Sequence, residues 1–315
     1  MKAETHYRLY GLTVASPLAL PCPRAARARR AEVRLVAGAP SRFGRLDRGR
    51  RSRRPARDWF YCRRLRTGAT YLRWAGLFEF LVSADGRDIA YHPLERASTE
   101  SLTTYLLGQV LSFSLLALGV EPLHGTVVEI GGEAVAFLGD CGYGKSTLGA
   151  AFLRLGHPIL TDDLMALEPS AAGYTVHPGM PRLKLFPGVA RRVLGAGRSG
   201  PRLNAATSKR ILPLAVGEVA PRAAPLRALY VLADPARGSS GPGARIGVER
   251  LRGGAALLEV IKGSFNTIVV DRDRLASQFA FASALAAAVP VKRLRYPRRF
   301  SRLPAVCEAV LADLA

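Results

Sequence analysis

The sequence predicts an α/β protein in which a small antiparallel β-rich module precedes a larger domain with a mixed sheet. Three observations support this class. An apolar strand, a glycine-rich loop and a helix follow one another between Ala134 and Leu155. Alternating apolar segments with hairpin turns dominate the beginning of the chain, and strand-like and helical segments share the remainder. We expect the β-rich module, which carries a basic loop, over 1–97 and the second domain over 98–315.

Composition limits the possible partners. The 315 residues have a hydrophobic content of 49%, which is typical of a globular chain with a sizeable core. The formal net charge is +22, from 46 basic and 24 acidic residues. The arginines are scattered and match no nucleic-acid-binding motif, so no nucleic acid is expected as a partner. A positive field would instead attract nucleotides and acidic peptides.

Two features favour a cytoplasmic location. The start of the chain is polar and lacks the apolar stretch of a secretory signal. The four cysteines (Cys22, Cys62, Cys141 and Cys307) are far apart without metal-type spacing, so disulfides are not expected. Segment 103–120 is uncharged and nearly long enough to span a bilayer, but polar residues interrupt it. We expect a buried helix there and no membrane partner.

The sequence of the first module predicts a series of short strands. They are expected over 31–37, 59–63, 70–74, 77–82 and 88–92, with a hairpin turn at Asp85-Gly86. The stretch 38–57 is rich in Gly, Pro and Arg and is either an exposed loop or a basic docking arm. A helix follows over 98–119, with Ser98 or Thr99 as its N-cap.

One stretch fits the phosphate-binding pattern G-x-x-x-x-G-K-[ST]: Gly139, Asp140, Cys141, Gly142, Tyr143, Gly144, Lys145, Ser146 and Thr147. The strand before it and the helix after it supply the context that the motif requires. Glycines allow backbone N–H groups to turn inward, and these donors hold a polyphosphate together with the positive end of the helix. Lys145 can reach the β- and γ-phosphates, and the Ser146 hydroxyl can bind Mg²⁺. Cys141 is either a loop filler or a site of oxidation sensitivity.

A pair of carboxylates, Asp162-Asp163, ends the next apolar strand. One can hold Mg²⁺ or its water, and the other can take a proton from a hydroxyl nucleophile. Neighbouring acids raise each other's pKa unless a cation is bound, so a metal is the natural partner. His124 opens the strand 123–130, which Gly131-Gly132 joins to the loop-bearing strand. By itself this histidine is either structural or catalytic.

Basic residues follow the acid pair. A hairpin is expected over 164–177, and then Arg182 and Lys184 alternate with leucines where they could touch phosphates or an acidic substrate. Residues 188–210 form either a surface connection or a substrate-binding segment. Further strands are expected over 225–232, 246–251 and 291–296, and helices over 253–263, 271–289 and 303–314.

Together these motifs resemble the catalytic domain of HPr kinase/phosphorylases. His124 lies 21 residues before Lys145, and Lys145 lies 17 residues before Asp162, which matches the spacing in that family. The chain resembles ATP-dependent phosphoenolpyruvate carboxykinase more distantly. Over nearly its whole length it is similar to HPr-kinase-like proteins of peptide-biosynthesis clusters. Some of these, associated with lasso peptides, phosphorylate a serine of the precursor peptide.

The resemblance implies a P-loop kinase domain and a role for each residue of the site. Lys145 and the loop amides would bind the phosphates of ATP, and Ser146 and Asp162 would hold Mg²⁺. Asp163 would accept the proton of the substrate hydroxyl, and His124 would lie beside the acid pair. The implied activity is transfer of the γ-phosphate to a serine hydroxyl of a peptide or protein.

Several alternatives stay open at this point. The chain could be a small-metabolite phosphotransferase of the carboxykinase-like fold, or a nucleotide-gated binding module without catalysis. HPr kinases form hexamers, so a homo-oligomer is possible. They also carry Glu after the loop serine, where this chain has Thr147, and an Arg-Gly-Leu-Gly signature that is not visible here. The reverse, phosphorylase reaction is therefore open as well.

Overall fold

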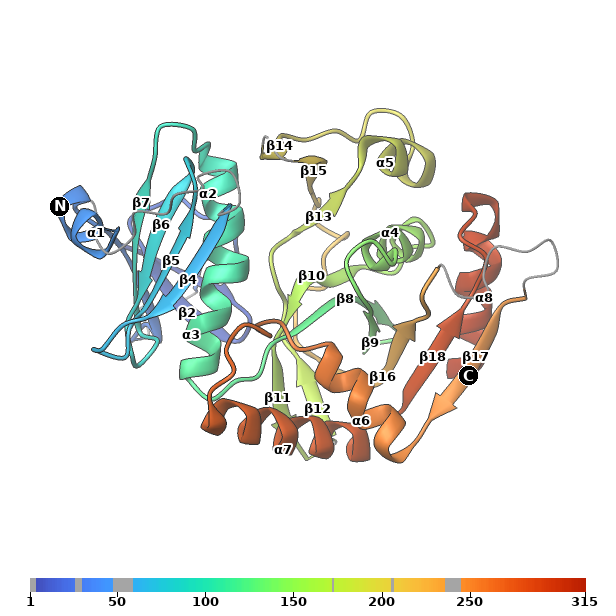
Figure 1. Cartoon of the computed structure of the whole chain (residues 1–315). Helices are drawn as coiled ribbons and strands as arrows, with labels where there is room; N and C mark the ends of the chain where they lie inside the picture. Colours follow the sequence, from blue (N-terminus) through green and yellow to red (C-terminus); the bar gives the residue numbers. More distant parts are fainter. Residues whose placement is uncertain (1–3, 26–29, 48–58, 172, 205–206, 236–244) are drawn as a thin grey trace. The chain divides into compact units, whose positions relative to one another are not determined.

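The computed structural model describes residues 4–25, 30–47, 59–171, 173–204, 207–235 and 245–315 (Figure 1). The chain divides into two compact units, Met1–Val120 and Glu121–Ala315. Each unit is built on a mixed sheet, which confirms the general α/β class expected from the sequence.

The first unit contains a seven-stranded sheet in the order β1-β2-β3-β7-β6-β5-β4. Its strands are β1 (Thr5–Leu9), β2 (Leu12–Ser16), β3 (Val33–Ala37), β4 (Phe60–Arg64), β5 (Thr70–Trp74), β6 (Phe78–Val82) and β7 (Asp88–Pro93). Strands β4 to β7 form the expected antiparallel meander. However, β3 pairs in parallel with both β2 and β7, so the sheet is not wholly antiparallel. Long connections on both sides of β3 permit this, since parallel neighbours cannot be joined by a tight turn.

Part of the expected basic loop is helical. Helix α1 (Pro40–Asp47) occupies its beginning, with Phe43 fully buried and stacked on His92 at a ring-centroid distance of 5.5 Å. Tertiary burial of one large aromatic side chain stabilises a helix that propensity alone would not form. The remainder of the stretch, 48–58, lies outside the described residues, and the loop or docking arm there stays a prediction.

The apolar segment after the first sheet is helical and buried, as predicted. It comprises α2 (Thr99–Tyr105), a π-helical turn η2 (Leu106–Val110) and α3 (Leu111–Ala117), and Ser98 caps α2. Tyr105 packs on Trp74 and on Phe78, each at 4.9 Å between ring centroids. Because of these contacts the segment clusters with the first unit, and the division falls after Val120, later than expected. Among the described residues, no helix is both long and apolar enough to cross a membrane.

The second unit contains an eight-stranded mixed sheet. Its strands are β8 (Leu123–Ile130), β9 (Glu133–Leu138), β10 (Ile159–Met165), β11 (Leu167–Ser170), β12 (Gly173–Val176), β16 (Ala224–Leu232), β17 (Gly247–Leu251) and β18 (Val291–Arg295). The turn Gly131-Gly132 joins β8 to β9, with φ angles of 62° and 84° that favour glycine. β9, β16 and β18 run in parallel, so their carboxyl ends meet at one edge of the sheet.

Helices cover both faces of this sheet (Figure 1). One hydrophobic cluster includes α4 (Lys145–Arg154), α5 (Pro187–Leu194) and α8 (Leu303–Leu314), and another includes α6 (Gly253–Lys262) and α7 (Arg272–Ala288). The helix that follows the glycine loop packs especially closely. A Cβ placed on Gly149 would lie 2.5 Å from Cγ2 of Thr126 on β8. This contact fixes α4 against the strand that lies beside the acid pair.

The expected connection over 188–210 is more structured than the sequence indicated. It contains most of α5, β14 (Arg202–Asn204) and the beginning of β15 (Thr207–Pro213). Pro187 begins α5, and Ala190 and Val193 are buried on its inner face. β15 pairs antiparallel with β14 and with β13 (Arg182–Leu185), forming a separate three-stranded sheet.

Candidate active site

The glycine loop joins β9 to α4, as the sequence predicted. Gly139, Gly142 and Gly144 have φ angles of 140°, 87° and 90°, which residues with a Cβ rarely adopt. Gly144 is the N-cap residue of α4, and no side chain of the described residues caps the helix there. The N–H groups of the first turn therefore remain available to an anion.

The Lys145 side chain lies inside the loop. The residue is 7% exposed, and its ammonium donates to the backbone carbonyls of Gly139 (2.6 Å) and Asp140 (3.1 Å). Burial lowers the pKa of Lys145, and the carboxylate of Asp162 partly offsets this effect. The lysine is thus held in position by neutral carbonyls, which an anionic phosphate can replace as the stronger partner.

Both carboxylate oxygens of Asp162 accept hydrogen bonds, and the residue is 4% exposed. Oδ1 accepts from the hydroxyls of Thr126 (2.6 Å) and Ser146 (2.8 Å). Oδ2 accepts from the backbone N–H of Lys184 at 3.0 Å. The carboxylate therefore links β8, α4 and β13. Because the Ser146 hydroxyl donates to Asp162, its lone pairs can face a cation.

Asp163 has an unusual backbone conformation. Its φ of 90° lies in the left-handed region, where Asp is tolerated better than most residues with a Cβ. Its Oδ2 lies 2.5 Å from Nζ of Lys184, and its Oδ1 lies 3.7 Å from Nδ1 of His124. Strained backbone at an ionisable residue is a feature of functional sites.

The charges around Asp163 set its protonation state. Burial raises the pKa of this carboxyl, but Lys184, His124 and Arg182 lower it more strongly, so the pKa lies well below its usual range. Burial also lowers the pKa of His124, although Asp163 opposes the shift. At neutral pH the site therefore presents an ionised Asp163 beside a neutral imidazole.

Lys184 is the site residue whose contacts the sequence did not specify. The alternation of basic residues with leucines showed only that Arg182 and Lys184 share a face of their strand. On the same face of the three-stranded sheet, Lys184 opposes Ile211, two residues after Lys209. The Lys209 ammonium lies 5.4 Å from the ring centroid of Phe186, and its charge acts on Lys145. Arg182, Lys184, Phe186 and Lys209 are named the basic face below.

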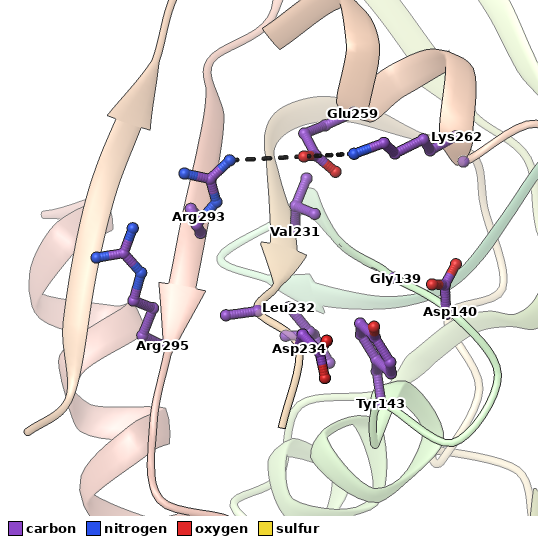
Figure 2. Close-up of a pocket in the computed structure, with 12 residues that line it drawn as sticks. Gly139, Asp140, Tyr143, Val231, Leu232, Asp234, Glu259, Lys262, Arg293 and Arg295 are labelled. Atoms are coloured by element: carbon purple, nitrogen blue, oxygen red, sulfur yellow. Dashed lines mark hydrogen bonds and ion pairs between the residues drawn. The ribbon is translucent and has the colours of Figure 1, made fainter. Parts of the chain in front are cut away.

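Two cavities lie beside the glycine loop. Cys141 is exposed, and Thr147 lies in the first turn of α4. Asp140 and Tyr143 line a cavity of about 800 Å³, which also contacts the end of β16 (Figure 2). Among its charged side chains, Glu259 pairs with Arg293 (3.5 Å) and with Lys262 (3.2 Å). A smaller cavity lies on the α8 side of the loop.

The donor set fits Mg²⁺ rather than a metal held by protein ligands alone. Within the described ranges, no three His, Cys, Asp or Glu residues gather in a metal-binding group. Mg²⁺ usually takes one or two carboxylates and completes its shell with water and substrate phosphates. The Ser146 hydroxyl and the Asp162 carboxylate beside it are hard oxygen donors of the required kind.

The fold and the site together define an α/β protein in which a loop lysine, a loop serine, a histidine and two adjacent carboxylates lie around one point. Lys145, Ser146, His124, Asp162 and Asp163 are brought together as the sequence predicted.

The chain is similar to HPr kinase/phosphorylases. It is 30% identical to the Lachnoclostridium phytofermentans protein over 91 residues, which are 28% of this chain and 29% of that relative. It is 30% identical to the Clostridium botulinum (strain Eklund 17B) protein over 73 residues, 23% of this chain and 24% of that one. The predicted resemblance to HPr kinase/phosphorylases is thereby confirmed, over a match that spans less than a third of the length of the curated relatives.

The structure of the Hpr(Ser) kinase/phosphatase from Coxiella burnetii aligns with 61% of this chain and 95% of its own, at 14% identity and a TM-score of 0.34. No protein-family model matches the chain.

Proposed function

We propose that this chain is an ATP- and Mg²⁺-dependent kinase that phosphorylates a serine hydroxyl of a peptide or protein. The hydrogen bond between Ser146 and Asp162 is the observation that carries the proposal. It joins the phosphate loop to the acid pair, so a bound triphosphate and the proton acceptor would meet at one point. A purely nucleotide-binding module would need the loop, but not an ionised Asp163 on strained backbone beside it.

The proposed mechanism relies on positioning and charge. Lys145 and the N–H groups at the start of α4 would hold the β- and γ-phosphates. Ser146 would bind Mg²⁺, and Asp162 would orient that hydroxyl and an Mg²⁺-bound water. When bound, Mg²⁺ would neutralise negative charge on the phosphates. Asp163 would accept the proton as the serine oxygen bonds to the γ-phosphorus and the bond to the β–γ bridging oxygen breaks. His124 would orient Asp163.

The basic face supports a peptide substrate that carries acidic groups. Lys184 pairs with Asp163, the charge of Lys209 acts on Lys145, and Phe186 is 46% exposed, so the face offers positive charge and one apolar contact beside the site. The likeness to kinases of peptide-biosynthesis clusters leads us to propose a ribosomally made precursor peptide, such as a lasso precursor, as the substrate.

Incubation with γ-labelled ATP and serine-bearing peptides tests the proposal. We expect Mg²⁺-dependent transfer of label to a serine, which mass spectrometry of the peptide would locate. ATP binding without transfer to any hydroxyl would support a binding module. Transfer only to small hydroxyl compounds would support a metabolite phosphotransferase.

Removal of the Lys184 charge is expected to change the pH dependence of the reaction. Asp163 works as a base only when it is ionised, and Lys184 lowers its pKa. In Lys184→Met the pKa of Asp163 should therefore rise, and the acidic limb of the kcat/KM profile should move to higher pH. Lys184→Arg keeps a cation and should leave that limb close to its wild-type position. An unshifted limb in Lys184→Met would show that another group controls it.

A further inference from the structure

A second, smaller cavity lies beside the glycine loop. It measures about 230 Å³ and is bounded on one side by Gly142, Gly144 and Thr147. On its other side it is bounded by the segment that leads from β18 to α8, including Arg298 and Phe300. Residues of the loop and of the first turn of α4 line this cavity. One ligand could therefore occupy the cavity while its phosphates are bound in the loop.

The part of the cavity wall that contacts the loop is a stacked aromatic–guanidinium pair. The guanidinium of Arg298 lies 4.0 Å from the ring centroid of Tyr296 and donates to the carbonyl of Ala233 at 2.7 Å. A Cβ placed on Gly144 would be 3.4 Å from both Nη1 of Arg298 and the hydroxyl of Tyr296, so this wall lies directly against the loop. Nε and Nη1 of Arg298 are buried, so these contacts hold the guanidinium in place as a rigid part of the cavity wall.

Phe300 adds an aromatic ring to the same cavity. It is 38% exposed, one of the large apolar side chains that the unit leaves accessible to solvent, and Arg192 lies 5.1 Å from its ring centroid. Leu303 also lines the cavity and is buried. An exposed aromatic ring on an apolar wall suits a flat, uncharged ring system, since stacking on such a surface tolerates any base.

The larger cavity of about 800 Å³ is a poorer match for such a ring. Half of its lining residues are charged, and Glu259 pairs with both Arg293 and Lys262. A neutral base placed beside these ion pairs would have to displace water from charged groups without replacing its hydrogen bonds.

We infer that the smaller cavity is the nucleoside subsite, in which the purine of the nucleotide stacks on the exposed ring of Phe300 while its phosphates occupy the loop. The inference rests on the proposed kinase function. It adds the residues that would make ATP bind more tightly than its phosphate chain alone.

Calorimetric titration with Mg·ATP and with Mg·tripolyphosphate tests this inference. Tripolyphosphate has the phosphates without the nucleoside, so the ratio of the two affinities measures how much the nucleoside contributes to binding. In Phe300→Ala, ATP affinity should fall by about 5- to 150-fold, the usual range for loss of one stacking contact, while tripolyphosphate affinity stays unchanged. Phe300→Tyr should retain ATP affinity. Phe279→Ala, which removes a 57% exposed ring from α7, is the matched control and should bind both ligands as the wild type does.

The outcomes separate the two proposals. Equal affinity of the wild type for ATP and tripolyphosphate would overturn the nucleoside subsite but leave the phosphate site in place. An equal loss of both affinities in Phe300→Ala, or no loss, would also overturn it. A selective loss of ATP affinity in Arg293→Met, with none in Phe300→Ala, would place the base in the larger cavity instead. Failure of the wild type to bind either ligand would overturn the kinase proposal and the subsite together.

Discussion

Replacement of Asp163 by asparagine is expected to lower kcat for phosphoryl transfer by about 10²- to 10⁴-fold, the usual contribution of a general base. Asparagine has nearly the shape of aspartate and tolerates the φ of 90° found at this position, so the backbone should be preserved. The variant loses the negative charge that contacts Lys184 and would receive the proton. ATP affinity should be unchanged, because Lys145 and the loop amides would hold the phosphates.

Asp273→Asn is a suitable control for this variant. Asp273 is an exposed carboxylate in the first turn of α7, so the same chemical change occurs there outside the site. Steady-state kinetics and calorimetric titration of ATP should be carried out on both variants. Wild-type turnover by Asp163→Asn would show that this residue is not the base.

The second large effect is expected at Lys145. Methionine has a similar length and remains compatible with a buried site, but it has no charge and donates no hydrogen bond. Loss of a charge-assisted hydrogen bond costs about 1.5–3 kcal/mol, so ATP affinity should fall by about 10- to 100-fold. Loss of a cation that faces the developing charge should also lower kcat by about 10²- to 10³-fold.

Lys292→Met provides the comparison for Lys145→Met. Lys292 is on β18 and pairs with Asp313 at 2.6 Å, away from the glycine loop in sequence and in partners. Both proteins should be assayed for ATP binding and for phosphate transfer. If Lys145→Met bound ATP as tightly as Lys292→Met does, the loop would not be the phosphate site.

Much of the site could be predicted because its parts are close in the sheet. The turn at Gly131-Gly132 requires β8 and β9 to be neighbours, and β10 pairs with the free edge of β8. Ser146 lies at the end of the loop that follows β9, in the first turn of α4. Asp162 lies opposite Thr126 on β8. The positions of the glycines and carboxylates in these neighbouring strands therefore place the loop next to the acid pair.

The contact between Lys184 and Asp163 could not be predicted in the same way. Alternation along β13 indicates which side chains share a face, but not which element this face meets. That depends on the packing of a separate three-stranded sheet whose strands are far apart in sequence. The left-handed backbone of Asp163 also had no local signal, since no glycine or turn motif marks this position.

Three features of the fold differed from expectation for related reasons. Alternating patterns do not distinguish parallel from antiparallel pairing, so the parallel neighbours of β3 were missed. The helices α1 and α5 are short and lie in arginine-rich stretches, where a few buried side chains such as Phe43 and Val193 decide the structure. The segment 99–117 packs on the first sheet through Tyr105, a tertiary contact that no linear pattern reveals.

A crystal structure with Mg²⁺ and a non-hydrolysable ATP analogue would test the central claim most directly. The claim predicts that Lys145 contacts the terminal phosphates, and that Mg²⁺ lies about 2.0–2.1 Å from the Ser146 hydroxyl oxygen. It also predicts that the Asp163 carboxylate faces the γ-phosphate across the space where a serine hydroxyl would enter. A triphosphate bound elsewhere, or one whose γ-phosphate points away from Asp163, would contradict it.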